Sequence, residues 1–218
     1  MAAYHSDARA ISLDDLQDRL LSTDLIPSQE PLRNGLAEKM EAIRAAGVQN
    51  VADLRAALKR PKPCAALSES AGVDVTYLRL LQRAINGFFP KPRPLKDIDW
   101  LGSDAVAGLA KAGITNTEQL FDAANDGKAD LAKRTGVKRK TLEEFTAIAD
   151  LCRIQWVSPV FARVILATGL DSAAAVARAK PETLCDAMVA ANADAKFYKG
   201  KVGLRDVRRL VKAAAYVP

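Results

Sequence analysis

Hydrophobic residues recur along the chain at spacings of three and four, and short polar turns that contain glycine interrupt them. This spacing is typical of amphipathic helices. The clearest internal match pairs Leu95–Ile114 with Leu151–Leu170 at a constant offset of 56 residues, with isoleucine, tryptophan and glycine in register. Because a repeat of this length implies stacked supersecondary units, the pattern predicts a protein built from helical repeats.

Each predicted unit contains a first kind of turn, in which a glycine is followed by an apolar residue, a polar pair and a new helix. Glycine suits the left-handed residue that ends a helix. The three glycines are Gly47, Gly113 and Gly169. Short polar side chains suit the N-cap of the helix that follows. The three capping residues are Asn50, Asn116 and Ser172.

A second kind of turn follows each of the first, so the two alternate three times. These turns centre on Gly72, Gly136 and Gly203. We expect three stacked units at residues 31–94, 95–151 and 152–218, the last with an insertion around Asn192–Lys201. Residues 1–30 are expected to form an N-terminal arm with a short helix, opened by a capping box at Ser12. The proline-rich residues 90–94 cannot be helical and separate the first unit from the rest.

Composition agrees with an all-α class, because 49% of residues are hydrophobic and only 6% are aromatic. Close packing of alanine and leucine favours helices over sheets. No stretch approaches the roughly 18 apolar residues of a membrane span, so we expect no membrane partner. The three cysteines are scattered and without nearby histidine, which fits reduced thiols in a soluble cytoplasmic protein. We expect no metal site and no cofactor.

Charge is unevenly distributed along the chain. The formal net charge is +6, and residues 1–58 carry six Lys or Arg against nine Asp or Glu. The remainder therefore holds 26 basic and 17 acidic residues. A basic excess is compatible with a nucleic-acid partner. Any anion-binding surface is expected in the later two-thirds of the chain.

The order of the two turns resembles the paired helix-hairpin-helix domains that accompany many DNA repair, recombination and polymerase modules. The segments Leu131–Val137 and Asp150–Ala162 resemble more closely an uncharacterised bacterial helix-hairpin-helix family, domain of unknown function 4332. The resemblance is clearest from Ile98 to the C-terminus. It implies tandem degenerate helix-hairpin-helix repeats and no particular activity, since fold alone does not give function.

One departure from DNA-binding helix-hairpin-helix proteins concerns the Gly-x-Gly motif of their first hairpin. The corresponding pairs here are Trp100 with Gly102, and Trp156 with Ser158. A tryptophan replaces the first glycine in both, which argues against phosphate binding at these two hairpins. We interpret both indoles as buried between hairpin helices. Base stacking is the alternative.

The strongest candidate site is the second turn of the middle unit, where five basic side chains surround a glycine that precedes a helix. Backbone amides, the positive end of a helix dipole and cations would meet there, as a phosphate requires. A solvated, solubilising loop is the alternative. The residues are Lys133, Arg134, Gly136, Lys138, Arg139 and Lys140.

A second basic cluster covers the insertion and the last predicted helix. Its helical members recur at spacings of three and four, so they share one face that could follow a duplex backbone. The alternative is the solvent side of a terminal helix, opposite Val207 and Leu210. The residues are Lys199, Lys201, Arg205, Arg208, Arg209 and Lys212.

The sequence does not support a catalytic function, because the single histidine, His5, lies near the N-terminus and no catalytic or nucleotide-binding motif is present. We therefore expect a non-enzymatic, sequence-independent binder of nucleic acid, with double-stranded DNA as the partner. The alternative is a protein-interaction scaffold that keeps degenerate hairpins as a helical spacer and binds a protein partner.

Overall fold

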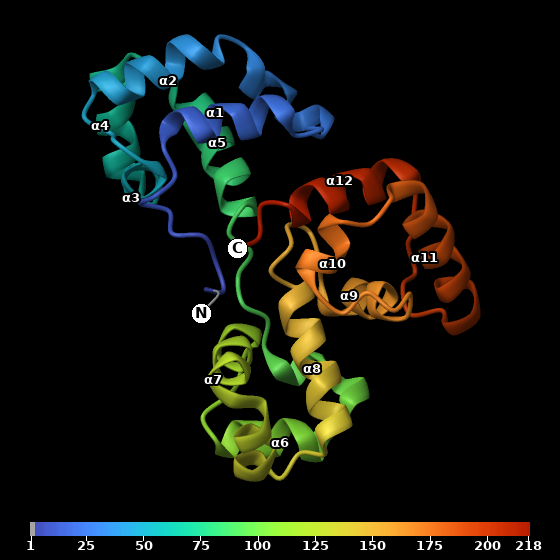
Figure 1. The fold of residues 1–218 in the computed structure, drawn as a ribbon. Helices are drawn as coiled ribbons and strands as arrows, with labels where there is room; N and C mark the ends of the chain where they lie inside the picture. Colours follow the sequence, from blue (N-terminus) through green and yellow to red (C-terminus); the bar gives the residue numbers. More distant parts are fainter. Residues whose placement is uncertain (1–2) are drawn as a thin grey trace. The chain divides into compact units, whose positions relative to one another are not determined.

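A computed structural model describes residues 3–218, apart from the side chains of residues 128 and 129. The described residues form helices α1 to α12 and the short 3-10 helices η1 to η3, without a β-strand, which confirms the all-α prediction (Figure 1). The chain divides into two compact units. We call Ser6–Phe89 the N-terminal unit, and Pro90–Pro218 with the residues up to His5 the C-terminal unit.

The N-terminal unit encloses its own hydrophobic core, to which every one of its helices contributes. Its first helix starts with the expected capping box: the Asp15 amide donates to Ser12 Oγ and the Ser12 amide donates to the Asp15 carboxylate, both over 3.0 Å. The elements are α1 (Leu13–Ser22), η1 (Pro27–Arg33), α2 (Leu36–Ala45), α3 (Val51–Leu58), α4 (Pro61–Ala71) and α5 (Val75–Gly87).

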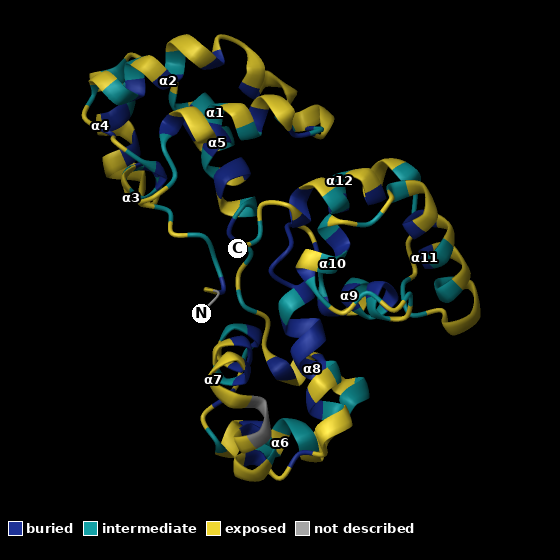
Figure 2. Ribbon diagram, in the orientation of Figure 1, coloured by how far each residue is buried: buried dark blue, intermediate teal, exposed yellow. Residues whose placement is uncertain are grey.

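The C-terminal unit is organised around α8, whose second half is buried except for the partly exposed Asp150 (Figure 2). A helix that is apolar all round belongs in a core. Its 3-10 helices are η2 (Leu95–Asp97) and η3 (Asp99–Leu101). Its α-helices are α6 (Ser103–Lys111), α7 (Thr117–Thr135, kinked at Gly127), α8 (Arg139–Leu151), α9 (Pro159–Leu166), α10 (Ala173–Ala177), α11 (Pro181–Ala195) and α12 (Leu204–Ala214).

The three turns of the first kind have the geometry expected from the sequence. Their glycines have positive φ angles of 94°, 80° and 87° at Gly47, Gly113 and Gly169. The polar residue of each turn accepts a hydrogen bond from an amide three residues later. These caps, at Asn50, Asn116 and Ser172, open α3, α7 and α10. The predicted helix ends and caps are confirmed.

The helix that follows each of these turns is also hydrogen-bonded to a residue earlier in the chain. The first amide of α3, at Val51, donates to the Ile11 carbonyl, and that of α7, at Thr117, donates to the Arg93 carbonyl. In the third case the Ala173 amide donates to a carboxylate oxygen of Asp150 over 2.6 Å. A side chain there replaces a backbone acceptor, so the same amide is satisfied in all three turns.

The turns of the second kind differ from one another more than expected. Gly72 and Gly136 end α4 and α7 with φ angles of 65° and 68°. Gly203 instead has φ −112° and stands at the N-cap of α12. The left-handed residue after α11 is Lys196, with φ 51°. The inserted residues therefore separate the end of one helix from the start of the next.

Arg153 holds the N-terminal residues within the C-terminal unit. It is 5% exposed, pairs with Asp150, and donates to the carbonyls of Ala3, Tyr4 and Pro218. The Tyr4 hydroxyl lies 2.7 Å from Thr117 Oγ1. Burial raises the pKa of this hydroxyl, so Tyr4 stays neutral.

The three cysteines are free and buried, which agrees with structural thiols. Burial raises the pKa of the Cys152 thiol to about 12, so its reactive thiolate is not populated at neutral pH. None of the helices in the described residues combines the length and the apolar character that a membrane span requires.

Candidate nucleic-acid interface

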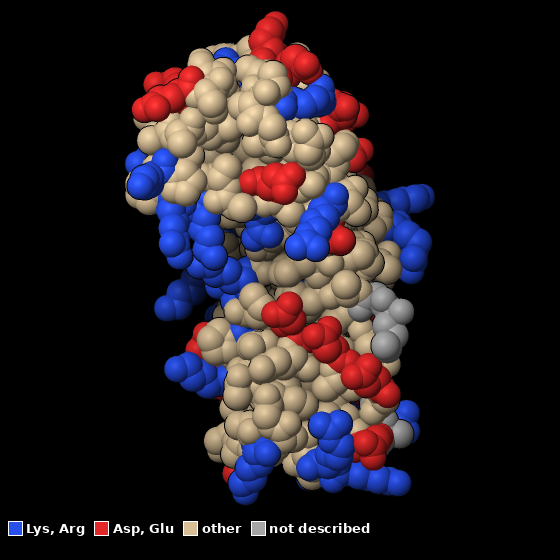
Figure 3. Space-filling model, turned by 90° about the vertical axis from the view of Figure 1, so that its left-hand side faces the viewer, with Lys and Arg blue, Asp and Glu red and all other residues tan. Residues whose placement is uncertain are grey.

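The positive charge of the protein belongs to one unit. The N-terminal unit carries 11 Lys or Arg and 11 Asp or Glu, so the other 21 basic and 15 acidic residues give the C-terminal unit the whole excess of +6. On the face drawn in Figure 3, the described basic side chains gather in separate groups with acidic groups between them. The local arrangement of cations therefore matters more than the total charge.

The first group surrounds the turn between α7 and α8, and the structure brings all its predicted residues together. Lys133 and Arg134 lie in the last turn of α7, and Lys138, Arg139 and Lys140 open α8. All five side chains are exposed, as is Gly136. The turn backbone is fixed from inside, because the Thr135 hydroxyl donates to the Leu131 carbonyl and accepts from the Val137 amide.

The start of α8 lacks a side-chain cap. Lys138 occupies the N-cap and makes no capping hydrogen bond. The amides of the first helical turn therefore have no side-chain acceptor there, which is the arrangement that favours an anion. Arg139 pairs with Glu143 on the helix surface. Among the described residues, no carboxylate pairs with Lys133, Arg134, Lys138 or Lys140.

Gly108 of α6 supports this turn, a contact that the sequence analysis missed. A methyl group at Gly108 would lie 2.5 Å from the Thr135 carbonyl oxygen and 3.3 Å from Val137 Cγ2. Only a residue without Cβ allows α6 to approach the turn this closely. The alanine-rich surroundings of Gly108 in the sequence carry no signal for the contact.

The second group is less uniform than its helical spacing suggested. Arg205, Arg208 and Lys212 of α12 are exposed, as are Lys199 and Lys201 of the preceding segment. Arg208 donates to Glu182 of α11 over 2.8 Å, and this bond lowers the pKa of Glu182. Arg209 instead packs over the Trp156 ring, 4.5 Å from its centroid.

The two groups lie at different ends of the C-terminal unit. In Figure 1 the start of α8 points away from α12, and its far end approaches that helix. At 1.5 Å per residue, the 13 residues of α8 span about 20 Å. A nucleic acid that contacts both groups must therefore present two separate segments of backbone.

The two tryptophans have different environments, which corrects their interpretation as equivalent buried side chains. Trp156 is 47% exposed and has φ 71°, a left-handed conformation that is rare for a bulky residue. Trp100 is partly buried, with its indole nitrogen enclosed and without an acceptor among the described residues. The core interpretation was therefore wrong for Trp156.

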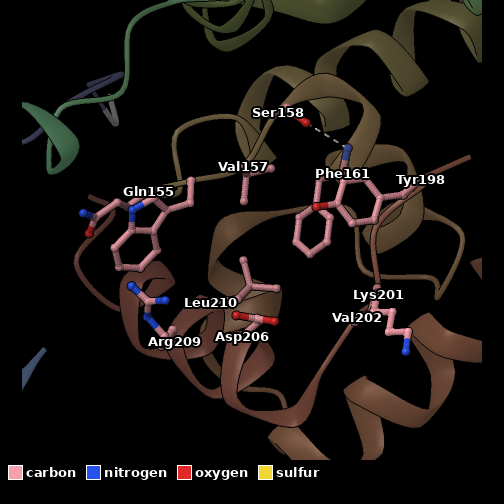
Figure 4. A pocket seen from close by; sticks show the side chains of 11 residues that line it. Gln155, Val157, Ser158, Phe161, Tyr198, Lys201, Val202, Asp206, Arg209 and Leu210 are labelled. Atoms are coloured by element: carbon pink, nitrogen blue, oxygen red, sulfur yellow. Dashed lines mark hydrogen bonds between the residues drawn. The ribbon is translucent and has the colours of Figure 1, made fainter. Parts of the chain in front are cut away.

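Trp156 borders a pocket of about 190 Å³ that lies within the third predicted unit (Figure 4). Residues before α9, the insertion and α12 all contribute to it. They include Val157, Phe161, Tyr198, Lys201, Asp206, Arg209 and Leu210. The sequence analysis identified Trp156, Lys201 and Arg209 as candidates but not that they converge on one pocket.

The described residues contain no group of three or more potential metal ligands. No curated protein and no solved structure matches the chain. A family model described as a domain of unknown function (DUF4332) matches residues 101–217, which are more than half of the chain. The protein therefore belongs to the DUF4332 family.

Proposed function

We propose that this protein is a non-enzymatic, cytoplasmic, sequence-independent nucleic-acid-binding protein whose partner is double-stranded DNA. The observation that carries the proposal is the turn between α7 and α8. There an uncapped helix start coincides with exposed lysines that no described carboxylate neutralises. A backbone phosphate would accept from the amides of the first turn of α8 while Lys138 and Lys140 supply charge.

The contacts proposed here position a nucleic acid without reading its sequence. Lysine and arginine contacts to phosphate release condensed counterions and carry no base information. The second group, on α12 and the segment before it, would meet another part of the backbone. Within that group Arg208 is partly neutralised by Glu182.

We also propose that the architecture consists of three degenerate helix-hairpin-helix repeats. The three turns of the first kind support this proposal, because all share a positive-φ glycine and a polar cap. After each turn the first amide of the next helix also donates a hydrogen bond to a residue earlier in the chain. The repeats depart most from the helix-hairpin-helix pattern at the hairpins that contain Trp100 and Trp156. In the middle repeat the 3-10 helices η2 and η3 stand in place of the first helix of that hairpin. Ser158 caps α9, so that helix start offers fewer amides to a phosphate.

The first test is titration of a labelled duplex of about three helical turns at several salt concentrations, with the triple variant Lys138→Ala, Arg139→Ala, Lys140→Ala. We expect weaker binding across unrelated sequences and a salt slope reduced by about 0.9 for each lost phosphate contact. The matched control removes three exposed cations from the N-terminal unit, namely Lys59, Arg60 and Lys62. An unchanged slope in the first variant would refute this placement of the site.

A protein-interaction scaffold is the second candidate, and one observation favours it. An open groove of about 1170 Å³ runs over the C-terminal unit between α8 and the segments around α9 and α10. It is lined by both charge signs, with Glu143, Asp171 and Arg163 beside the apolar Leu166 and Phe197. A protein partner retained after nuclease digestion would support the scaffold, and loss of every partner on digestion would exclude it.

A further inference from the structure

We propose that the pocket beside Trp156 binds the base of one unpaired pyrimidine nucleotide together with a phosphate of that nucleotide. The inference rests on the proposed nucleic-acid function and extends it from duplex backbone to single-stranded segments. The shared chemistry is a small aromatic ring with a neighbouring anion, as found in a single strand or a free nucleotide.

The pocket has an apolar floor and an aromatic wall. Val157 and Leu210, only 2% and 3% exposed, form the floor, and Phe161 and Tyr198 face the pocket together (Figure 4). The two rings contact edge to face, with centroids 5.2 Å apart. Asn192 fixes the wall, because its side chain bonds both the amide and the carbonyl of Tyr198 over 2.8 Å. The wall is therefore preorganised.

Trp156 provides the second aromatic element, at a cost to backbone stability. A non-glycine residue with positive φ costs about 1–2 kcal/mol. The side chain is nevertheless 47% exposed, so packing of the indole offsets little of this cost. Strain of this kind persists mostly at functional sites. Its position at the rim makes Trp156 available to stack on a base.

The size of the pocket selects a single ring. Its volume is about 190 Å³, somewhat larger than the roughly 150 Å³ of a cavity that accommodates benzene. A pyrimidine fits this space, and the amide of Gln155 and the hydroxyl of Ser158 line it beside the ring. An apolar pocket with a few polar groups at its edge is the usual form of a small-ligand site.

Charge at the rim favours an anionic ligand. Lys201 and Arg209 line the pocket with one acid, Asp206. The guanidinium of Arg209 lies over the Trp156 ring, 4.5 Å from its centroid, so its positive charge is held beside the indole. Two cations against one carboxylate disfavour a quaternary ammonium ligand, which aromatic pockets otherwise accept.

The test uses the fluorescence of Trp156 in the full chain. The protein has two tryptophans, so Trp100→Phe leaves Trp156 as the single reporter. We expect a 15-nucleotide oligothymidylate to quench this fluorescence, and an abasic strand of equal length and charge to bind without quenching. Thymidine monophosphate distinguishes the source: equal affinity for it indicates a nucleotide site, and much weaker affinity indicates a single strand.

A second variant separates loss of the ring from loss of the fold. Trp156→Gly removes the indole at a position whose φ of 71° suits glycine, so the melting temperature should stay the same or rise. Binding of labelled oligothymidylate should weaken about tenfold. The Trp100→Phe protein is the control and should bind as tightly as the parent chain.

The outcomes separate this inference from the proposed function. Equal quenching by the abasic strand, unchanged affinity of Trp156→Gly, or quenching by tetramethylammonium in place of nucleic acid would overturn the pocket assignment. If the duplex still bound with a steep salt slope, the proposed function would stand. Failure of both duplex and single strand to bind would overturn both.

Discussion

The turn between α4 and α5 and the turn between α7 and α8 have almost the same backbone and opposite chemistry. Gly72 and Gly136 have φ angles of 65° and 68°, and the N-cap residues Asp74 and Lys138 have φ angles of −55° and −56°. The carboxylate of Asp74 accepts from the amides of Thr76 and Tyr77 over 2.8 and 3.1 Å. Lys138 makes no such bond.

This difference between Asp74 and Lys138 shows that the residues needed to form the turn are not those that let it bind an anion. The left-handed glycine and the extended N-cap are enough to reverse the chain in both units. An acidic cap satisfies the amides internally and presents negative charge, whereas lysine leaves them without a side-chain acceptor and presents positive charge. One residue can thus convert a closed helix start into a candidate anion site.

The largest effect is expected from Gly108→Ala, which disturbs the support of only one of the two turns. Helix propensity alone predicts that this change stabilises α6 by about 1 kcal/mol. The clash with Thr135 predicts the opposite, because overpacking costs about 1–3 kcal/mol. Because the clash is with backbone, we expect the cost to exceed the gain and the free energy of unfolding to fall by up to about 2 kcal/mol, measured by chemical denaturation.

The sign of the change in unfolding free energy for Gly108→Ala tests the contact, because helix propensity predicts stabilisation and the clash with Thr135 predicts destabilisation. The corresponding residue of α2 is Ala42, so the turn between α4 and α5 already tolerates a methyl group there. Stabilisation by Gly108→Ala would mean that the close approach of α6 does not support the turn between α7 and α8.

The parts of this comparison that could be predicted from the sequence are local. A glycine and a polar cap act within a few residues, so the turns at Gly47, Gly113 and Gly169 were predicted and are confirmed. The resemblance to domain of unknown function 4332 is likewise confirmed over residues 101–217. The contact at Gly108 could not be predicted, because it depends on how closely one helix approaches another.

The environment of the tryptophans could not be predicted for a related reason. Trp100 and Trp156 occupy matching sequence positions, yet burial depends on neighbours that the repeat does not share. Arg209 packs over Trp156, while Arg163 packs over Trp100. Arg153 was missed because its partner Tyr4 lies 149 residues away in the sequence.

A smaller effect, and the most direct test of the comparison, is expected from Lys138→Asp. An aspartate at this N-cap should accept from the amides of α8 as Asp74 does for α5, raising the free energy of unfolding by about 1 kcal/mol. The same change should weaken duplex binding and lower its salt slope. Lys138→Ala is the control, since it removes the charge without adding a cap. Equal stability of the two variants would contradict the capping argument.

The smallest effect concerns pH and the turn between α4 and α5. Hydrogen bonds from the Tyr77 and Thr76 amides lower the pKa of Asp74 below its usual 3.8. A group whose pKa is lowered by folding contributes stability above its unfolded pKa and loses it as pH falls through the folded value. Asp74→Asn keeps an amide oxygen as acceptor and cannot titrate, so its melting temperature should fall less between pH 4 and about pH 2 than that of the parent chain. If the melting temperatures of the two proteins fell equally, ionisation of Asp74 would not contribute to the cap. Asp74 and Lys138 would then differ only in whether the side chain can accept a hydrogen bond from the helix amides.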